Sequence, residues 1–258
     1  MFPTLIRFGD FRIATYGLLV AAGYLVGLWW LNTQRERMGL SEKHFWGVVY
    51  AAFFGAIAGG KLLYWAVEWR DLLAGDLRLL RDFRYGFVYF GGLLGAFFTA
   101  WLYQRRTGFD YLKTADYFAL ATAFGHALGR LGCLAAGCCA GRPTTLPWGI
   151  RFDHPECLVD PRLAGVPLHP TQLYESAAEG LIAAALYRLL RRGERGQLPP
   201  GTVLAAYVGL YAAVRFVIEF FRGDDRGGFF LAMSVSQWVA LGCLLAAAAF
   251  IVRRARRP

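Results

Sequence analysis

Seven long apolar stretches constrain what this chain of 258 residues can fold into. A helix needs about 20 predominantly apolar residues to cross the hydrocarbon core of a membrane. The stretches run approximately over Arg12–Gln34, His44–Trp65, Phe87–Tyr103, Ala115–Ala136, Thr171–Leu190, Thr202–Phe221 and Leu231–Val252. No soluble domain fits between them. The sequence therefore predicts an all-α integral membrane protein with about seven transmembrane helices, folded as a single polytopic domain over residues 1–258.

The composition agrees with a membrane protein. Hydrophobic residues make up 57% of the chain and aromatic residues 16%, which is more apolar than a soluble domain of this size. Met1–Asp10 is short and mixed, and the first apolar stretch is too long for a signal peptide, so we expect no cleaved leader. The net charge of +10 is explained by basic loops between spans. No aromatic-basic arrangement suggests nucleic acid as a partner.

Basic residues gather in alternate connections between the apolar stretches. Clusters with few acidic residues follow the first, third, fifth and seventh stretches, whereas the other connections mix arginine with aspartate and glutamate. Cytoplasmic loops are enriched in Lys and Arg, so we expect the N-terminus outside and the C-terminus in the cytoplasm. The cluster residues are Arg35, Arg37, Lys43, Arg105, Arg106, Lys113, Arg188, Arg191, Arg192, Arg195, Arg253, Arg254, Arg256 and Arg257.

This orientation places unusual polar residues and glycines from five stretches at one level, in the outer half of the membrane. They are Tyr16, Tyr89, Gly91, Gly92, Arg130, Glu175, Arg215, Glu219 and Arg222. A charged arginine is costly in hydrocarbon and normally faces a partner or a wet cavity. Arginine also holds phosphate by two parallel hydrogen bonds. The pattern therefore predicts a site for a phospholipid head group.

Simpler interpretations exist for several of these residues. Tyr16 and Tyr89 could be interfacial anchors, and glycines permit close helix packing. Arg215, Glu219 and Arg222 are spaced to share one helical face, so Arg215 could form a local ion pair with Glu219. His126 lies one turn before Arg130 on the same face and is a further candidate for the site.

Three cysteines end the fourth stretch, and residues 141–170 then form a loop long enough to cap a site outside the membrane. Cys133, Cys138 and Cys139 could be small packing residues. A disulfide could join Cys133 to Cys138 or to Cys157. A zinc ion bound by some of these thiols and His126 could hold an acceptor thiol. Packing is the simplest interpretation, and we expect no cofactor.

Taken in order, these motifs resemble the bacterial phosphatidylglycerol–prolipoprotein diacylglyceryl transferases. The matching segments are Tyr16-Gly17, Gly59-Gly60-Lys61, Gly91-Gly92-Leu93-Leu94-Gly95, Gly129-Arg130-Leu131-Gly132 with Gly141, His169-Pro170-Thr171-Gln172-Leu173-Tyr174-Glu175 and Arg215–Arg222. The resemblance implies a multi-pass enzyme of the bacterial cytoplasmic membrane. It would move a diacylglyceryl group from phosphatidylglycerol, a membrane lipid, to the lipobox cysteine of a prolipoprotein and release glycerol phosphate.

The resemblance also implies roles for residues. Arg130, Arg215, Glu175 and Tyr16 would be catalytic, and we add His126 because of its place beside Arg130. Residues expected to bind substrate are Tyr89, Gly91, Gly92, Cys133, Cys138, Gly141, Glu219 and Arg222. Many members carry His or Tyr where this chain has Phe90, and polar residues where it has cysteines. The general base therefore stays open, with Glu175 and His126 favoured over Tyr89 and His169.

Alternative functions follow from the same features. The different cysteine loop is compatible with a transferase that uses another acceptor. A membrane thiol oxidoreductase would use the cysteines, but such enzymes usually need a Cys-x-x-Cys pair, which the chain lacks. A transporter or lipid-binding protein without chemistry would predict repeated halves with broken helices, and no clear repeat is present.

Overall fold

The computed structural model describes residues 2–9, 11–74, 86–223, 229–231 and 233–255. Each predicted apolar stretch corresponds to one long helix, so the all-α prediction is confirmed. Arg256 and Arg257 of the basic tail lie outside the described residues. The long helices are α1 (Thr15–Thr33), α2 (Glu42–Val67), α4 (Tyr89–Thr107), α5 (Tyr111–Ala136), α6 (Thr171–Glu194), α7 (Thr202–Ile218) and α8 (Val235–Ala255).

Several of these helices could cross a membrane. Among the described residues, four combine sufficient length with sufficient apolarity: α2, α5, α7 with its short continuation to Phe221, and α8. The protein therefore has membrane-type helices, while seven crossings and their orientation stay predictions.

Short elements accompany the helices. A β-hairpin is formed by β1 (Thr4–Phe8) and β2 (Phe11–Ala14), so the first helix begins at Thr15 and not near Arg12 as predicted. The remaining elements are α3 (Trp69–Ala74), η1 (Pro161–Leu163), η2 (Glu219–Phe221), β3 (Phe229–Phe230) and β4 (Met233–Ser234).

The described residues form two compact units, one of which covers residues 32–111. In this unit α2 packs against α4 through glycines. A Cβ on Gly59 would lie 2.3 Å from the carbonyl oxygen of Gly91, and a Cβ on Gly95 would lie 2.2 Å from that of Gly55. Such close approach of two backbones requires glycine. Thr99 strengthens the contact because its Oγ1 donates to the carbonyl of Ala51 at 2.6 Å.

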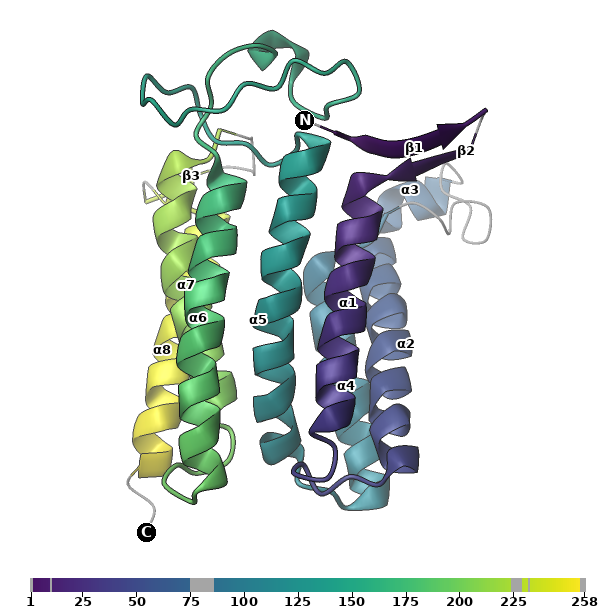
Figure 1. The fold of residues 1–258 in the computed structure, drawn as a ribbon. Helices are drawn as coiled ribbons and strands as arrows, with labels where there is room; N and C mark the ends of the chain where they lie inside the picture. Colours follow the sequence, from purple (N-terminus) through teal and green to yellow (C-terminus); the bar gives the residue numbers. More distant parts are fainter. Residues whose placement is uncertain (1, 10, 75–85, 224–228, 232, 256–258) are drawn as a thin grey trace. The chain divides into compact units, whose positions relative to one another are not determined.

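The other unit comprises residues 1–31 and 112–258 and contains α1, α5, α6, α7 and α8 (Figure 1). Helix α1 lies against α5, where a Cβ on Gly23 would be 3.1 Å from the carbonyl oxygen of Gly125. The start of α7 is held by Asp116 of α5. Its buried carboxylate accepts hydrogen bonds from the backbone N–H groups of Gly201 and Leu204, both at 2.8 Å. Capping by a carboxylate satisfies donors that the first helical turn leaves unpaired.

The loop between α5 and α6 folds over one end of this unit (Figure 1). As predicted, residues 141–170 contain no α-helix. Leu168 is fully buried and pairs with Ile150 in a short antiparallel bridge. Glu156 ties the loop to the hairpin, because it accepts a hydrogen bond from Thr4 Oγ1 at 2.6 Å and faces Arg7 at 3.5 Å. The Thr4 hydroxyl, followed by the charge of Arg7, lowers the pKa of Glu156.

Candidate active site

Three arginines from separate parts of the chain converge on one carboxylate, that of Glu175. Glu175 lies in the second turn of α6 and is completely buried. Arg130 of α5 contacts it through Nε. Arg215 of α7 and Arg222 each place an Nη1 atom 3.8 Å from its Oε1. The structure therefore brings together four of the charged residues that the sequence predicted for one site.

Glu219 extends this cluster on the α7 side. Its Oε2 lies 2.5 Å from Nη2 of Arg215, which confirms the ion pair expected from their spacing. Its Oε1 accepts a hydrogen bond from Ser234 Oγ at 2.9 Å. The prediction that Arg222 shares the helical face is wrong, because α7 ends at Ile218 and the backbone at Arg222 is extended. Arg222 still reaches Glu175, by way of the 3₁₀ turn of η2.

His126 forms a second pair with a residue that the sequence analysis missed. Its Nδ1 lies 2.7 Å from Oε1 of Glu179, which is fully buried one turn after Glu175. Its Nε2 faces Nε of Arg130 at 3.2 Å. Arginine can only donate, so Nε2 is the acceptor and Nδ1 carries the proton toward Glu179. The signal for Glu179 was present, since an acid inside an apolar stretch is expected to have a partner.

The formal charges of the cluster balance. It contains three arginines and the three carboxylates of Glu175, Glu179 and Glu219, of which Glu179 is paired with His126. Arg215 is buried, and its Nη1 and Nη2 atoms pair with Glu175 and Glu219 without well-directed hydrogen bonds. The oxygens of a phosphate group accept such hydrogen bonds from guanidinium groups. The site therefore has the chemistry to bind an anionic head group.

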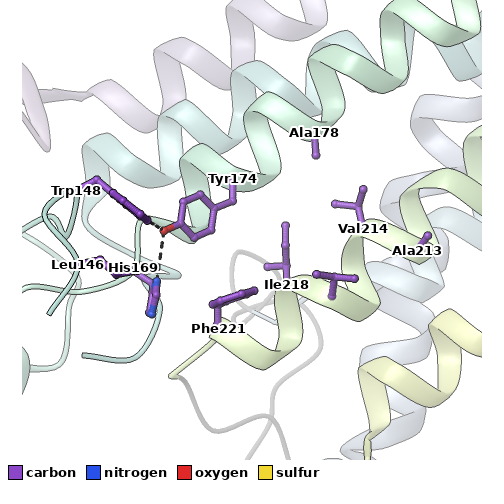
Figure 2. A pocket seen from close by; sticks show the side chains of 10 residues that line it. Leu146, Trp148, His169, Tyr174, Ala178, Ala213, Val214, Ile218 and Phe221 are labelled. Atoms are coloured by element: carbon purple, nitrogen blue, oxygen red, sulfur yellow. Dashed lines mark hydrogen bonds between the residues drawn. The ribbon is translucent and has the colours of Figure 1, made fainter. Parts of the chain in front are cut away.

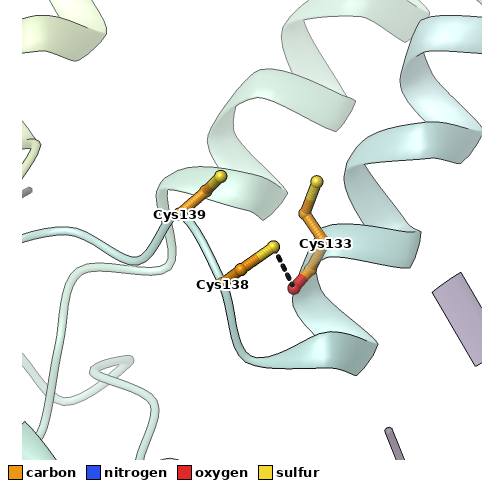
Figure 3. Close-up of side chains that lie close together, drawn as sticks. All are labelled: Cys133, Cys138 and Cys139. Atoms are coloured by element: carbon orange, nitrogen blue, oxygen red, sulfur yellow. Dashed lines mark hydrogen bonds between the residues drawn. The ribbon is translucent and has the colours of Figure 1, made fainter. Parts of the chain in front are cut away.

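The three cysteines that follow Arg130 form a compact cluster (Figure 3). The Sγ atoms of Cys133, Cys138 and Cys139 all lie within 4.8 Å of one another, and all three thiols are free. Cys133 is in the last turn of α5, and the chain then reverses through Gly137, whose φ is +71°. The thiols of Cys133 and Cys138, followed by the guanidinium of Arg222, lower the pKa of Cys139.

An open apolar pocket of about 680 Å³ is lined by residues of α6, α7 and the loop before α6 (Figure 2). Several lining residues directly precede charged ones in the sequence, so the pocket and the charges occupy adjoining faces of α6 and α7. At its rim the Tyr174 hydroxyl accepts a hydrogen bond from Trp148 Nε1 at 2.8 Å and lies 3.3 Å from His169 Nδ1. The lining residues are Leu146, Trp148, His169, Tyr174, Ala178, Ala213, Val214, Val217, Ile218 and Phe221.

Two further predicted residues belong to the same unit. Tyr16, in the first turn of α1, lies against the end of α5, since a Cβ on Gly132 would be 3.2 Å from its Cδ2. Gly141 fills a position without space for a side chain, because a Cβ there would lie 2.5 Å from the carbonyl oxygen of Phe221. The N–H of Arg142 donates to that same carbonyl at 2.9 Å. Gly141 therefore fixes the backbone that leads into Arg222.

The other predicted residues belong to the unit of α2 and α4. Tyr89 begins α4, is 71% exposed and contacts the ring of Phe90. Gly91 packs against Gly59, and a Cβ on Gly92 would lie 3.2 Å from the carbonyl oxygen of Ala56. These contacts account for both glycines by helix packing. A role for these three residues in binding substrate stays a prediction.

The model of one protein family matches nearly the whole chain. The family described as prolipoprotein diacylglyceryl transferase matches residues 3–253. A phosphatidylglycerol–prolipoprotein diacylglyceryl transferase of Clostridium tetani is 33% identical over 241 residues, covering 93% of each chain. The one of Cupriavidus pinatubonensis is 32% identical over 267 residues, covering 99% of this chain and 92% of the relative. This chain, with its arginines gathered around Glu175, belongs to the prolipoprotein diacylglyceryl transferase family.

Proposed function

We propose that the protein transfers the diacylglyceryl group of phosphatidylglycerol to the lipobox cysteine of a prolipoprotein and releases glycerol phosphate. The relatives carry the name of this reaction. The observation that carries the proposal is the convergence of Arg130, Arg215 and Arg222 on one buried position between membrane-type helices. Few molecules other than an anionic lipid head group reach such a position.

The arginines bind the phosphate of the donor and stabilise the leaving group. The bond that breaks joins the glyceryl carbon to a phosphate oxygen, so negative charge grows on glycerol phosphate as it leaves. Donors that are already in place stabilise such charge more strongly than water does. Both oxygens of Glu175 are engaged by arginines, so Glu175 holds these side chains in position and is not the general base.

His126 is then the better candidate for the base. Its Nε2 accepts a hydrogen bond from Nε of Arg130 at 3.2 Å. When Arg130 turns to a phosphate, Nε2 is released and can accept the proton of the acceptor thiol. Glu179, 2.7 Å from Nδ1, stabilises the resulting imidazolium. Tyr16 of α1 packs against the end of α5 at Gly132, and we propose that it contacts the acceptor.

The apolar pocket receives an acyl chain of the donor. Its lining comes from residues such as Val214, Ile218 and Phe221, each of which precedes a charged residue of the site. A lipid whose phosphate is bound by the arginines could therefore place a chain on the adjoining face. Apolar walls with few polar groups suit such a ligand.

The protein crosses the bacterial cytoplasmic membrane seven times, with its N-terminus outside. The basic clusters after alternate helices support this orientation. The site then lies at the outer leaflet, and the loop of residues 141–170 faces the compartment into which prolipoproteins emerge.

The test is a transfer assay with the purified protein, phosphatidylglycerol vesicles and a lipobox peptide. Glycerol phosphate release and a peptide heavier by one diacylglyceryl group are expected together. A matched peptide with serine in place of cysteine should give neither product. If the protein binds phosphatidylglycerol but leaves the cysteine peptide unmodified, the acceptor proposed here is wrong.

A further inference from the structure

The three cysteines at the end of α5 have the arrangement of a metal site. Among the described residues they form the one group of three potential ligands whose donor atoms all lie within 4.8 Å of one another. Three sulfurs on a tetrahedral zinc ion, with Zn–S of about 2.3 Å, lie about 3.8 Å apart. Small side-chain rotations would bring these thiols to that spacing. His126 is outside the group, because its ring nitrogens face Glu179 and Arg130.

Two hydrogen bonds from the start of α6 hold the backbone around the cysteines. Gln172 Nε2 donates to the carbonyl oxygen of Cys138 at 2.7 Å, and Thr171 Oγ1 donates to the carbonyl oxygen of Cys139 at 2.8 Å. Both side chains are buried. Cys139 has a φ of +61°, which is uncommon for a residue other than glycine. These contacts fix the backbone that carries two of the three thiols.

The surrounding charge suits a metal bound by three thiolates. Three thiolates and one Zn²⁺ carry a net charge of −1. The guanidinium of Arg222 lies beside the Cys139 thiol, and Arg130 is one turn before Cys133. Thiolates are the zinc ligands of choice, and sites with three protein ligands leave a fourth position open. A disulfide would use two of the three thiols and leave the third without a role.

We propose that Cys133, Cys138 and Cys139 bind a zinc ion whose open fourth position takes the thiol of the acceptor cysteine. This proposal rests on the proposed transferase function. Zinc binding releases the three thiol protons, and coordination of the acceptor releases one more, which His126 or solvent accepts. The zinc-bound sulfur then attacks the glyceryl carbon with a lone pair, forming a C–S bond. The C–O bond to phosphate breaks, and glycerol phosphate leaves with that electron pair.

The proposal also reduces the basicity that His126, the proposed base, needs. A metal that holds the acceptor as a thiolate lowers the need for a dedicated base, because thiols bound to a metal are deprotonated.

The first experiment measures metal directly and needs no activity. The full-length protein, purified without chelator, is analysed for zinc and then reloaded with Co²⁺. We expect one zinc per chain and a near-ultraviolet sulfur-to-cobalt charge-transfer band with tetrahedral ligand-field bands. Cys133→Ser, Cys138→Ser and Cys139→Ser should each lose most of the bound metal. Cys243→Ser, which changes a cysteine of α8 outside the group, should retain it.

Two results would overturn the metal site. One is protein that binds neither zinc nor cobalt while all three thiols remain reduced. The other is a disulfide among these cysteines, found by mass spectrometry in protein isolated without oxidant, which would assign them a redox role. Because the unsubstituted protein gives both readouts, misfolding of a cysteine variant cannot obscure the answer.

The second experiment tests the open position. A lipobox peptide added to the cobalt-loaded protein should intensify the charge-transfer band as a fourth thiolate binds, whereas its serine analogue should not. A band unchanged by the cysteine peptide would overturn the acceptor role. If the band responds but no diacylglyceryl group is transferred, the zinc site stands and the proposed transferase function fails.

Discussion

At the scale of single residues, the site depends on how Glu175 is surrounded. A carboxylate without exposure to water is costly unless it is paired, and Glu175 is paired with Arg130, Arg215 and Arg222. The negative charge of Glu175 offsets the repulsion among the three guanidinium groups. The carboxylate therefore allows three cationic side chains to lie close together.

Replacing Arg130 by alanine should reduce the rate of transfer strongly. Loss of one buried donor to a developing charge typically costs about 3 kcal/mol, or roughly a hundredfold in rate. Glycerol phosphate release in vesicles would measure it. Arg188→Ala, at an exposed position of α6, is the matched control and should leave the rate unchanged. Full activity of Arg130→Ala would exclude a phosphate-binding role for this residue.

Replacing Glu175 by glutamine should lower both activity and stability. The amide has the same shape but leaves three largely buried arginine side chains without their common counter-charge, and breaking a buried ion pair costs about 3–5 kcal/mol. We expect a clear fall in the free energy of unfolding, measured with denaturant in detergent micelles. Glu36→Gln, at an exposed glutamate, should show no such fall. A stable and fully active Glu175→Gln protein would contradict the role of Glu175 in holding the arginines.

At the scale of elements, the start of α6 connects three parts of the site. Within five residues it supplies Thr171 and Gln172 to the cysteine turn and Glu175 to the arginines. The pocket residue Tyr174 belongs to the same turn. One helix end therefore sets the spacing between the thiols, the head-group site and the apolar pocket.

Gly141→Ala tests how the loop positions Arg222. The new Cβ would lie 2.5 Å from the carbonyl oxygen of Phe221, so the backbone next to Arg222 must shift, at a cost of about 1–3 kcal/mol. Transfer activity should fall while the helical circular dichroism is preserved. Gly193→Ala is the control because a Cβ there meets no atom within 4 Å. Equal activity of both variants would show that this close approach is unimportant.

Filling the apolar pocket should weaken donor binding more than catalysis. Ala213→Phe places a ring in the cavity between α6 and α7, so the KM for phosphatidylglycerol should rise severalfold while kcat changes less. Ala184→Phe, at an exposed position of α6, should change neither constant. An unchanged KM for Ala213→Phe would place the acyl chain elsewhere.

The positions of the long helices could be predicted because the length of an apolar stretch can be read directly from the sequence. Arg130, Glu175 and Arg215 could be grouped because a charged side chain in an apolar stretch is costly without a partner. Glu179 also lies in an apolar stretch and was missed despite this signal, because nothing in the sequence singles out His126 of α5 as its partner. The β1–β2 hairpin was missed although Gly9-Asp10 between two short runs with apolar and aromatic residues is a hairpin signal. Contacts with Glu156 help to hold it. The geometry of the cysteine turn depends equally on distant side chains.

At the scale of the whole molecule, function depends on which side of the membrane each end of the helices faces. The loop of residues 141–170 and the basic loop between α6 and α7 lie at opposite ends of α6. Only one orientation of the chain presents the site to secreted proteins.

Cysteine labelling in intact cells tests this orientation. Arg162→Cys lies at an exposed position of the loop after α5, and Gln197→Cys in the connection between α6 and α7. A thiol reagent that cannot cross membranes should label Arg162→Cys above the level of the unsubstituted protein. It should label Gln197→Cys only after the cells are permeabilised. The reverse pattern would invert the proposed topology.

The hydrogen bonds from Thr171 and Gln172 to the cysteine carbonyls also limit how the chain can change in length. One residue inserted between Gln172 and Glu175 would rotate Glu175 by about 100° around α6 and separate it from the arginines. Insertions in the turn that follows η1, next to the exposed Arg162, would leave these contacts intact. Descendants of this sequence are therefore expected to gain and lose residues near that turn, where a new module for recruiting particular lipoproteins could be added without rebuilding the site.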